Sequence, residues 1–269
     1  MKTLNIKGEN SEYQIIDALK NNRSKRAGRG EIFIEGIESI KQAFESGLEI
    51  TRIITTGKVS NWAGNILRKY ENAGTCIIEM DEILYGRLCE KSEPSEMLVT
   101  ARMPKRELYD TSLPEKPFIL VLDRPSDAGN LGSVIRSANS FGVDSVLIIG
   151  HGVDPWEPKT IRASLGSVFF TVPVQIESMQ KFGEYADFVK DKYCADVLGT
   201  DSGGDCSLDS ERIKRPVMLV LGNEAKGMSV ALKNLCDKII GIPVSGNVNS
   251  LNLASAASIF MWEIFRNSR

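Results

Sequence analysis

A series of short, uninterrupted apolar runs in the second half of the chain is the feature that most restricts its fold. The runs are FILVLD (118–123), SVLIIG (145–150), VFFTVPV (168–174), CADVLGT (194–200), VMLVLGNE (217–224) and KIIGIPV (238–244). Runs bounded by Gly, Pro and Asp indicate strands buried on both faces, because a half-exposed strand would alternate apolar and polar residues. Amphipathic segments lie between the runs. The pattern predicts an α/β domain with a mostly parallel sheet covered by helices.

The first hundred residues predict a smaller α/β unit. Helical spacing of apolar residues begins at Ser11, Ile37 and Asn61, and strands are expected at 31–36, 49–56 and 75–80. A polar stretch with prolines, 101–116, follows and is typical of a linker or exposed connection. We therefore predict two domains, 1–112 and 113–269.

Composition limits the compartment and the chemistry. The five cysteines are widely separated and never form a C-x-x-C pair, which favours a reducing compartment and argues against a zinc site. No apolar stretch approaches a membrane span, and the N-terminus does not resemble a signal peptide, so we expect a cytoplasmic protein without membrane contact. The single histidine, His151, excludes metal sites built on several histidines, and we expect no metal.

Three segments of the second domain place Gly, Asn and Ser just past a buried strand, where α/β folds bind ligands. The first has a loop with Gly129 and Gly132 before a helix that carries Arg136. It is neither a G-x-G-x-x-G fingerprint nor a P-loop. It fits a phosphate-binding turn or an ordinary strand-to-helix turn with a solvated arginine, and the residues alone do not choose between them.

The second segment, 217–229, places Asn223 and Glu224 after a strand, between Gly222 and Gly227. The third, 238–260, crowds serines and asparagines in front of an apolar helix. Asn249 or Ser250 would suffice as a helix cap. The excess of hydrogen-bonding side chains favours a ligand site.

These three segments, in this order, resemble the three motifs of the SpoU/TrmH family of RNA ribose methyltransferases in the SPOUT superfamily. The similar residues are Asn130, Gly132, Arg136 and Ala138 in the first, Gly222, Asn223, Glu224 and Gly227 in the second, and Ile242, Pro243, Ser250, Leu251 and Asn252 in the third. The stretch 159–166 is similar to a family segment between the first two motifs. Residues 33–36 and the helix after them resemble the substrate-binding domain often fused in front, which itself resembles RNA-binding ribosomal proteins.

The resemblance implies a SPOUT-type α/β-knot that binds S-adenosylmethionine in a bent form among three loops. It also implies a homodimer with active sites at the subunit interface. The expected reaction is methyl transfer to a ribose 2′-hydroxyl of RNA, with ribosomal RNA favoured over transfer RNA. The residues that the resemblance assigns to the methyl donor are Thr200, Gly222, Ile242 and Leu251.

The remaining site residues are also assigned by resemblance. Ser250 and Asn252 are expected to order the loop and the substrate pocket, and Asn130 and Arg136 to face the ribose. Glu224 would hold the donor or order its own loop. Arg136 would be either the base or a phosphate clamp, and the clamp is favoured because a guanidinium stays protonated.

RNA binding requires local cations, because the formal net charge is −2. Arg23, Lys25, Arg26 and Arg29 form a cationic stretch, interpreted as a flexible RNA-binding loop or, alternatively, as an ordinary solvated charge run. Arg162, in the segment between the first two motifs, is also assigned to RNA.

Three alternative functions stay open at this stage. A nucleotide-dependent oxidoreductase is disfavoured by the missing glycine fingerprint and the missing acidic partner. A transfer-RNA ribose methyltransferase would use the same motifs. A non-catalytic RNA-binding or ribosome-assembly factor would keep the fold but would not need the polar residues of all three motifs.

Overall fold

The computed structural model describes residues 2–70, 74–90, 95–110, 112–247 and 250–269. It contains two compact units. The N-terminal unit comprises Met1–Pro104 together with Trp156–Phe169, and the C-terminal unit comprises Lys105–Pro155 with Phe170–Arg269. The division predicted between 112 and 113 stays a prediction. The contacts between residues place the end of the first continuous stretch at Pro104, and they assign the later segment Trp156–Phe169 to the same unit.

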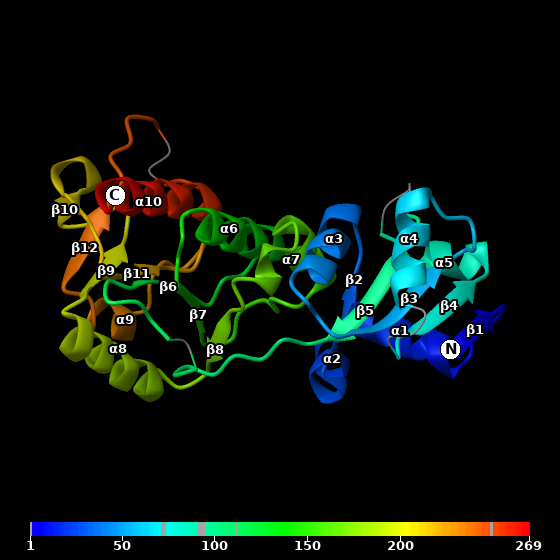
Figure 1. The fold of residues 1–269 in the computed structure, drawn as a ribbon. Helices are drawn as coiled ribbons and strands as arrows, with labels where there is room; N and C mark the ends of the chain where they lie inside the picture. The colour runs from blue at the N-terminus through cyan, green and yellow to red at the C-terminus, as the bar shows by residue number, and fades with distance from the viewer. Residues whose placement is uncertain (1, 71–73, 91–94, 111, 248–249) are drawn as a thin grey trace. The chain divides into compact units, whose positions relative to one another are not determined.

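The C-terminal unit is built on a seven-stranded sheet in the order β10-β12-β9-β11-β6-β7-β8, in which all neighbours are parallel (Figure 1). The predicted mostly parallel sheet is thereby confirmed, while the knot stays a prediction. The strands are β6 (Phe118–Asp123), β7 (Ser145–Ile149), β8 (Val174–Ile176), β9 (Asp196–Thr200), β10 (Cys206–Ser207), β11 (Val217–Leu221) and β12 (Lys238–Gly241). Every residue of β6, β7 and β11 is buried, which explains their continuous apolar sequences.

Helices cover both faces of this sheet (Figure 1). On one face α6 (Ala128–Ser140) packs beside α10 (Leu253–Asn267), where the hydroxyls of Ser137 and Ser258 lie 2.9 Å apart. On the other face lie α8 (Met179–Tyr193) and the short α9 (Val230–Lys233). Phe182 and Leu232 from these two helices join the strand side chains in one apolar core.

Two sequence predictions for this half of the chain were wrong. The run 168–174 is not a strand: it contains a 3₁₀ turn, Ser167–Phe169, and only Val174 belongs to β8. Pro173 explains part of this, because proline cannot donate to a strand ladder. The cap of α10 is Asn252, whose side chain accepts a hydrogen bond from the Ala254 amide. Ser250 is not the cap, and Asn249 lies outside the described residues.

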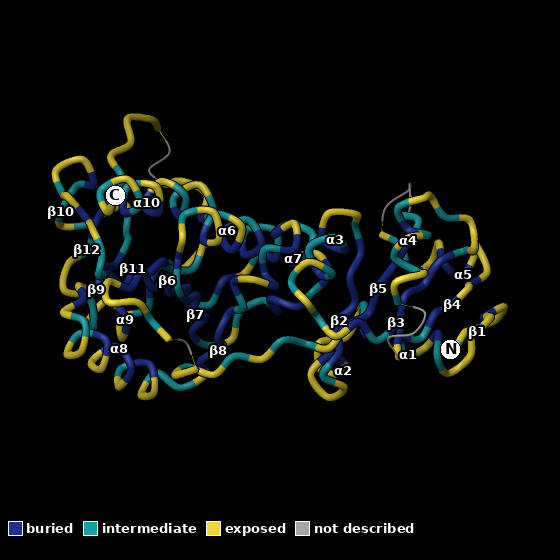
Figure 2. Tube along the Cα trace, in the orientation of Figure 1, coloured by how far each residue is buried: buried dark blue, intermediate teal, exposed yellow. Residues whose placement is uncertain are grey.

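The N-terminal unit has a five-stranded mixed sheet in the order β1-β4-β3-β5-β2. Its strands are β1 (Lys2–Ile6), β2 (Glu31–Ile34), β3 (Ile50–Thr55), β4 (Cys76–Met80) and β5 (Leu98–Arg102). Its helices are α1 (Ser11–Asn21), α2 (Arg23–Arg29), α3 (Ile37–Glu45), α4 (Asn61–Tyr70), α5 (Glu82–Leu88) and, from the later segment, α7 (Pro158–Ala163). Figure 2 shows that burial concentrates in β2, β3, β4 and β5 of this sheet, whereas β1 is largely exposed.

Sequence periodicity predicted three of these strands and three helices, and it missed β1, β5, α2, α5 and α7. The loop predicted around Arg23–Arg29 is wrong, because α2 spans it. The Asn22 side chain caps this helix by accepting from the Lys25 amide, and Gly30 ends it with φ +62°. A short helix with one buried residue has too little apolar periodicity to be recognised.

Candidate active site

A cavity of about 540 Å³ opens in the C-terminal unit where β9, β11 and β12 end. This volume lies within the range of small-molecule sites. Segments far apart in the chain line it together, because the carboxyl ends of parallel strands meet at one edge of the sheet. The lining residues are Asn130, Thr200, Asp201, Ser202, Leu221, Gly222, Asn223, Glu224, Ala225, Gly227, Ile240, Ile242, Val244, Ser250, Leu251, Asn252, Leu253, Ala256 and Phe260.

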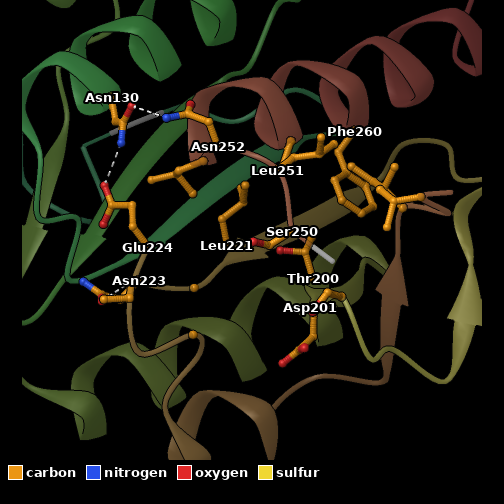
Figure 3. A pocket seen from close by; sticks show the side chains of 18 of the residues that line it. Asn130, Thr200, Asp201, Leu221, Asn223, Glu224, Ser250, Leu251, Asn252 and Phe260 are labelled. Carbon is orange, nitrogen blue, oxygen red and sulfur yellow. Dashed lines mark hydrogen bonds between the residues drawn. The ribbon is translucent and has the colours of Figure 1, made fainter. Parts of the chain in front are cut away.

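A row of three polar side chains forms one end of the cavity (Figure 3). The Nδ2 atom of Asn252 donates to Oδ1 of Asn130 at 2.9 Å, and Nδ2 of Asn130 donates to Oε1 of Glu224 at 3.3 Å. These bonds join all three segments, one residue from each. They also fix the orientation of both amides, because each nitrogen faces an oxygen.

Glu224 is held as a carboxylate. Partial burial raises its pKa, but hydrogen bonds from Ser126, from backbone amides and from Asn130 outweigh burial and leave the pKa below its ordinary value. Oε2 accepts from the Ser126 amide at 3.0 Å and from its hydroxyl at 2.6 Å. Both carboxylate oxygens are thus engaged with the loop of the first segment. This arrangement supports loop ordering as the role of Glu224.

The turn after β11 brings backbone close to the cavity. A β-carbon added at Gly222 would lie 2.4 Å from the backbone nitrogen of Met228, so only glycine fits there. The Asn223 side chain closes the turn by accepting from the Ala225 and Lys226 amides, each at 3.0 Å, and by donating to the Arg124 carbonyl at 2.6 Å. The turn is therefore tied to the loop after β6.

Apolar side chains and a hydroxyl form the rest of the cavity. Figure 3 shows Leu221 and Leu251 between the polar row and the side of the cavity that holds Thr200 and Phe260, with the Asp201 carboxylate pointing away from the cavity centre. Asp201 instead binds Lys233 at 2.6 Å. That hydrogen bond, together with one from the Gly203 amide, lowers the pKa of Asp201. The cavity thus combines an apolar middle with polar groups at its two ends, as small-molecule sites usually do.

The structure brings together eight of the residues assigned from the sequence: Asn130, Thr200, Gly222, Glu224, Ile242, Ser250, Leu251 and Asn252. Arg136 does not line this cavity. It is exposed on α6 and lines a separate hollow of about 280 Å³ with Ser133, Ser137, Ser140 and Phe141. Asn130 and Arg136 share one helix, but six residues separate them by about 9 Å along its axis.

Sequence reasoning missed Leu221, Asp201 and Phe260 as lining residues. Leu221 and Asp201 could have been predicted as lining residues, because each is adjacent in sequence to a predicted site residue at a strand end. Phe260 could have been predicted from helical spacing, because Leu253, Ala256 and Phe260 lie on one face of α10, and this face lines the cavity.

The residues assigned to RNA lie in the N-terminal unit and differ in their surroundings. Arg23, Lys25 and Arg29 are exposed on α2. Arg26 is 3% exposed, and its guanidinium donates to the carbonyls of Leu19 at 2.9 Å and Lys20 at 3.0 Å. It therefore holds α2 against the end of α1.

Arg162, on α7, is mostly buried and pairs with two carboxylates. It donates to the buried Glu35 at 2.8 Å and to Glu90. Its surroundings favour a role in seating α7 against the rest of the N-terminal unit, where the Ser39 hydroxyl also reaches the Ile161 carbonyl.

Within the described ranges, no group of three or more His, Cys, Asp and Glu side chains is arranged to hold a metal ion. No helix among these residues is long and apolar enough to cross a bilayer.

A parallel α/β unit with a cavity at the carboxyl ends of its strands defines the class of α/β proteins that bind a small ligand at this edge of the sheet. Residues 117–262 match the SpoU rRNA methylase family, and residues 10–99 match the SpoU L30e-like domain. The chain belongs to the SpoU rRNA methylase family.

Individual relatives agree with this assignment. The 23S rRNA (uridine(2479)-2′-O)-methyltransferase of Streptomyces viridochromogenes is 35% identical over 268 residues, which are 97% of this chain and 91% of that protein. The crystal structure of the SpoU methyltransferase AviRb from the same organism, in complex with AdoMet, matches with a TM-score of 0.89 and 33% identity over 97% of this chain and 100% of that one. The AdoMet-bound rRNA methyltransferase from Sinorhizobium meliloti matches with a TM-score of 0.86 and 25% identity over 98% of both chains.

These findings confirm the main sequence prediction. The protein is an S-adenosylmethionine-dependent RNA 2′-O-methyltransferase of the SpoU/TrmH type, with an N-terminal SpoU L30e-like substrate-binding domain. The oxidoreductase alternative is thereby excluded.

Proposed function

We propose that the protein methylates a ribose 2′-hydroxyl of 23S ribosomal RNA and does so as a homodimer. The single observation that carries the location of the reaction is the cavity in which Asn130, Glu224 and Asn252 are linked by hydrogen bonds. The S. viridochromogenes enzyme, with which the chain aligns over nearly its whole length, supports the choice of RNA.

S-adenosylmethionine fits the cavity. Gly222 lines the cavity in a turn packed so closely against Met228 that no side chain could be accommodated there. Leu221, Leu251 and Phe260 supply an apolar surface for a base. We assign the adenosine to Gly222, Ile242 and Leu251, with Thr200 at one end. The bound donor supplies an activated methyl group on a sulfonium, and the protein then has to align the acceptor hydroxyl and receive its proton.

We assign the polar row to the reacting end of the site. Asn130 and Asn252 present amide groups at the cavity mouth, and their mutual bond keeps them in one orientation. We propose that they align the ribose, while Ser250 orders the loop and Glu224 keeps the first-segment loop closed through Ser126.

Arg136 is proposed to act across a dimer interface. It is exposed, lies outside the cavity of its own protomer, and lines a hollow that includes Phe141. Phe141 belongs to a surface aromatic cluster with Trp262 and Phe265, and Trp262 is 49% exposed. Pairing of the α6 and α10 surfaces of two copies would cover this cluster and bring Arg136 to the partner's cavity as a phosphate clamp.

A direct test combines methyl transfer with complementation. The purified protein is incubated with unmodified 23S rRNA transcript and labelled S-adenosylmethionine, and the product is mapped for 2′-O-methylation. An Arg136→Ala protein and a Gly222→Ala protein are then assayed apart and as mixed dimers. Restored activity in the mixture supports sharing of the site between protomers. Methylation of transfer RNA alone, or of no RNA, would overturn the proposed substrate.

A further inference from the structure

Arg124, the residue directly after β6, has a left-handed backbone conformation with φ +48°. Such a conformation is energetically unfavourable for a residue other than glycine. Glycine would avoid this cost, so the backbone does not explain an arginine at this position. Its side chain must contribute something that offsets the strain.

The guanidinium is held in place by a buried carboxylate. Nε and Nη2 of Arg124 donate to the two carboxylate oxygens of Asp123 at 2.7 and 3.0 Å, and Asp123 is 2% exposed. Asp123 also accepts from the Ser229 amide at 2.7 Å. The Arg124 side chain passes over Gly150, where an added β-carbon would lie 3.1 Å from Cγ. The charge is therefore fixed where β6, β7 and β11 end.

Part of this fixed charge faces solvent. The Arg124 side chain is 36% exposed. A guanidinium carries five N–H groups, and the bonds to Asp123 account for two of them. Among the described residues no acceptor is recorded for the others. Pre-positioned guanidinium N–H groups suit phosphate oxygens, because their geometry allows two parallel hydrogen bonds.

The loop that carries Arg124 is bound to residues that line the cavity. The Arg124 carbonyl accepts from Asn223, and two residues later Ser126 donates to Glu224. Arg124 does not itself line the cavity, but its backbone is tied directly to a residue that does, so its guanidinium belongs to the loop beside the site in which we propose that the ribose is methylated. A ribose within an RNA chain has a phosphate on each side, and an acidic protein must meet these phosphates with local cations.

We propose that Arg124 binds a phosphate of the RNA beside the methylated ribose and so positions the substrate strand. This inference rests on the proposed RNA substrate. It makes Arg124 a positioning residue and Asp123 the group that holds it.

The rival interpretation is that Arg124 only neutralises the buried Asp123. A double variant separates the two. Arg124→Gly alone removes the cation and leaves Asp123 buried without its partner, so we expect a lower melting temperature. Asp123→Asn with Arg124→Gly removes both charges and the backbone strain while the amide oxygen still accepts from Ser229, so we expect stability to return.

The experiment measures binding of 23S rRNA transcript by the full-length protein across a salt series, together with donor affinity by calorimetry. The double variant is expected to bind RNA about tenfold more weakly at low salt, with a salt slope shallower by about 0.7–1. Its KM for RNA should rise with little change in kcat, and its donor affinity should match the unmodified protein. Lys181→Ala, which removes an exposed cation from α8, serves as the control and should change none of these quantities.

Unchanged RNA affinity and salt slope in the double variant would overturn the inference and assign Arg124 to neutralising Asp123. Failure of the unmodified protein to bind or methylate the transcript would overturn the proposed function instead, and the inference with it. The two failures are distinguishable because the unmodified protein is measured first.

Discussion

The Nδ2 atom of Asn252 donates a hydrogen bond of 2.9 Å to Oδ1 of Asn130, a residue 122 positions earlier in the chain. Asn252 also caps α10 through its own oxygen, while Asn130 lies in the first turn of α6. One bond therefore couples the starts of two helices that pack side by side. This end of the cavity has a fixed shape, because the amide oxygen and the amide nitrogen of both asparagines are engaged in hydrogen bonds.

We expect Asn252→Ala to weaken the site in two ways. It removes a helix cap, which costs about 1 kcal/mol, and it leaves the Asn130 carbonyl oxygen without its donor. Methyl transfer should fall more than tenfold while RNA affinity is nearly unchanged. Asn252→Asp keeps the cap but cannot donate to Asn130, so it should recover stability without recovering turnover. Thermal denaturation and single-turnover kinetics measure the two effects.

Gly222→Ala is expected to abolish uptake of S-adenosylmethionine. The added β-carbon would lie 2.4 Å from the Met228 nitrogen, so the turn must shift into the cavity or unfold locally, at a cost of about 1–3 kcal/mol. Calorimetry with the donor or its demethylated product provides the measurement. Gly183→Ala is the matched control, because nothing lies within 4 Å of its β-carbon on α8, and it should bind normally and be slightly more stable. Normal donor affinity in Gly222→Ala would refute our placement of the adenosine.

Arg136→Lys keeps the positive charge but loses the planar fork of donors. If Arg136 clamps a phosphate and stabilises developing negative charge, kcat should fall by about tenfold or more while donor affinity stays the same. Arg136→Ala should lower kcat further than Arg136→Lys does. Near-normal turnover in the lysine variant would show that positional hydrogen bonding by this residue is unimportant.

Two arginines of α2 should behave differently. Arg26 is buried and donates to two carbonyls, so Arg26→Met should lower the free energy of unfolding by about 1–3 kcal/mol. Arg29 is exposed at the end of the helix, so Arg29→Ala should leave stability within about 0.5 kcal/mol and weaken RNA binding at low salt. Chemical denaturation and RNA titration distinguish them. An Arg29 variant with unchanged salt dependence would remove α2 from the RNA surface.

Acid should loosen the active-site loop through Glu224. Its pKa is lower in the folded protein than in the unfolded chain, so its contribution to stability is present above the ordinary glutamate pKa of about 4.3 and is lost as the pH falls through the folded value. We therefore expect the melting temperature of the native protein to fall faster with acidification than that of Glu224→Gln. Parallel pH profiles for the two proteins would contradict this account.

The sequence by itself determined the α/β class, the parallel sheet and most of the cavity wall. Buried parallel strands require continuous apolar runs, and the positions just after them are where such folds bind ligands, so Gly222, Glu224 and Asn252 could be singled out without coordinates. The same reasoning failed where the local pattern was weak. It read 168–174 as a strand and the Arg23–Arg29 helix as a loop.

Only the tertiary structure decided which residues meet. Periodicity describes a residue's neighbours along one element, but a hydrogen bond between Asn130 and Asn252 or between Ser126 and Glu224 depends on how separate loops are arranged across a sheet. The structure placed Arg136 outside the cavity and buried Arg26, although both carry the same charge in the sequence as the exposed arginines around them. It also revealed the left-handed backbone of Arg124 and its ion pair with Asp123, because neither feature can be recognised from the amino-acid sequence.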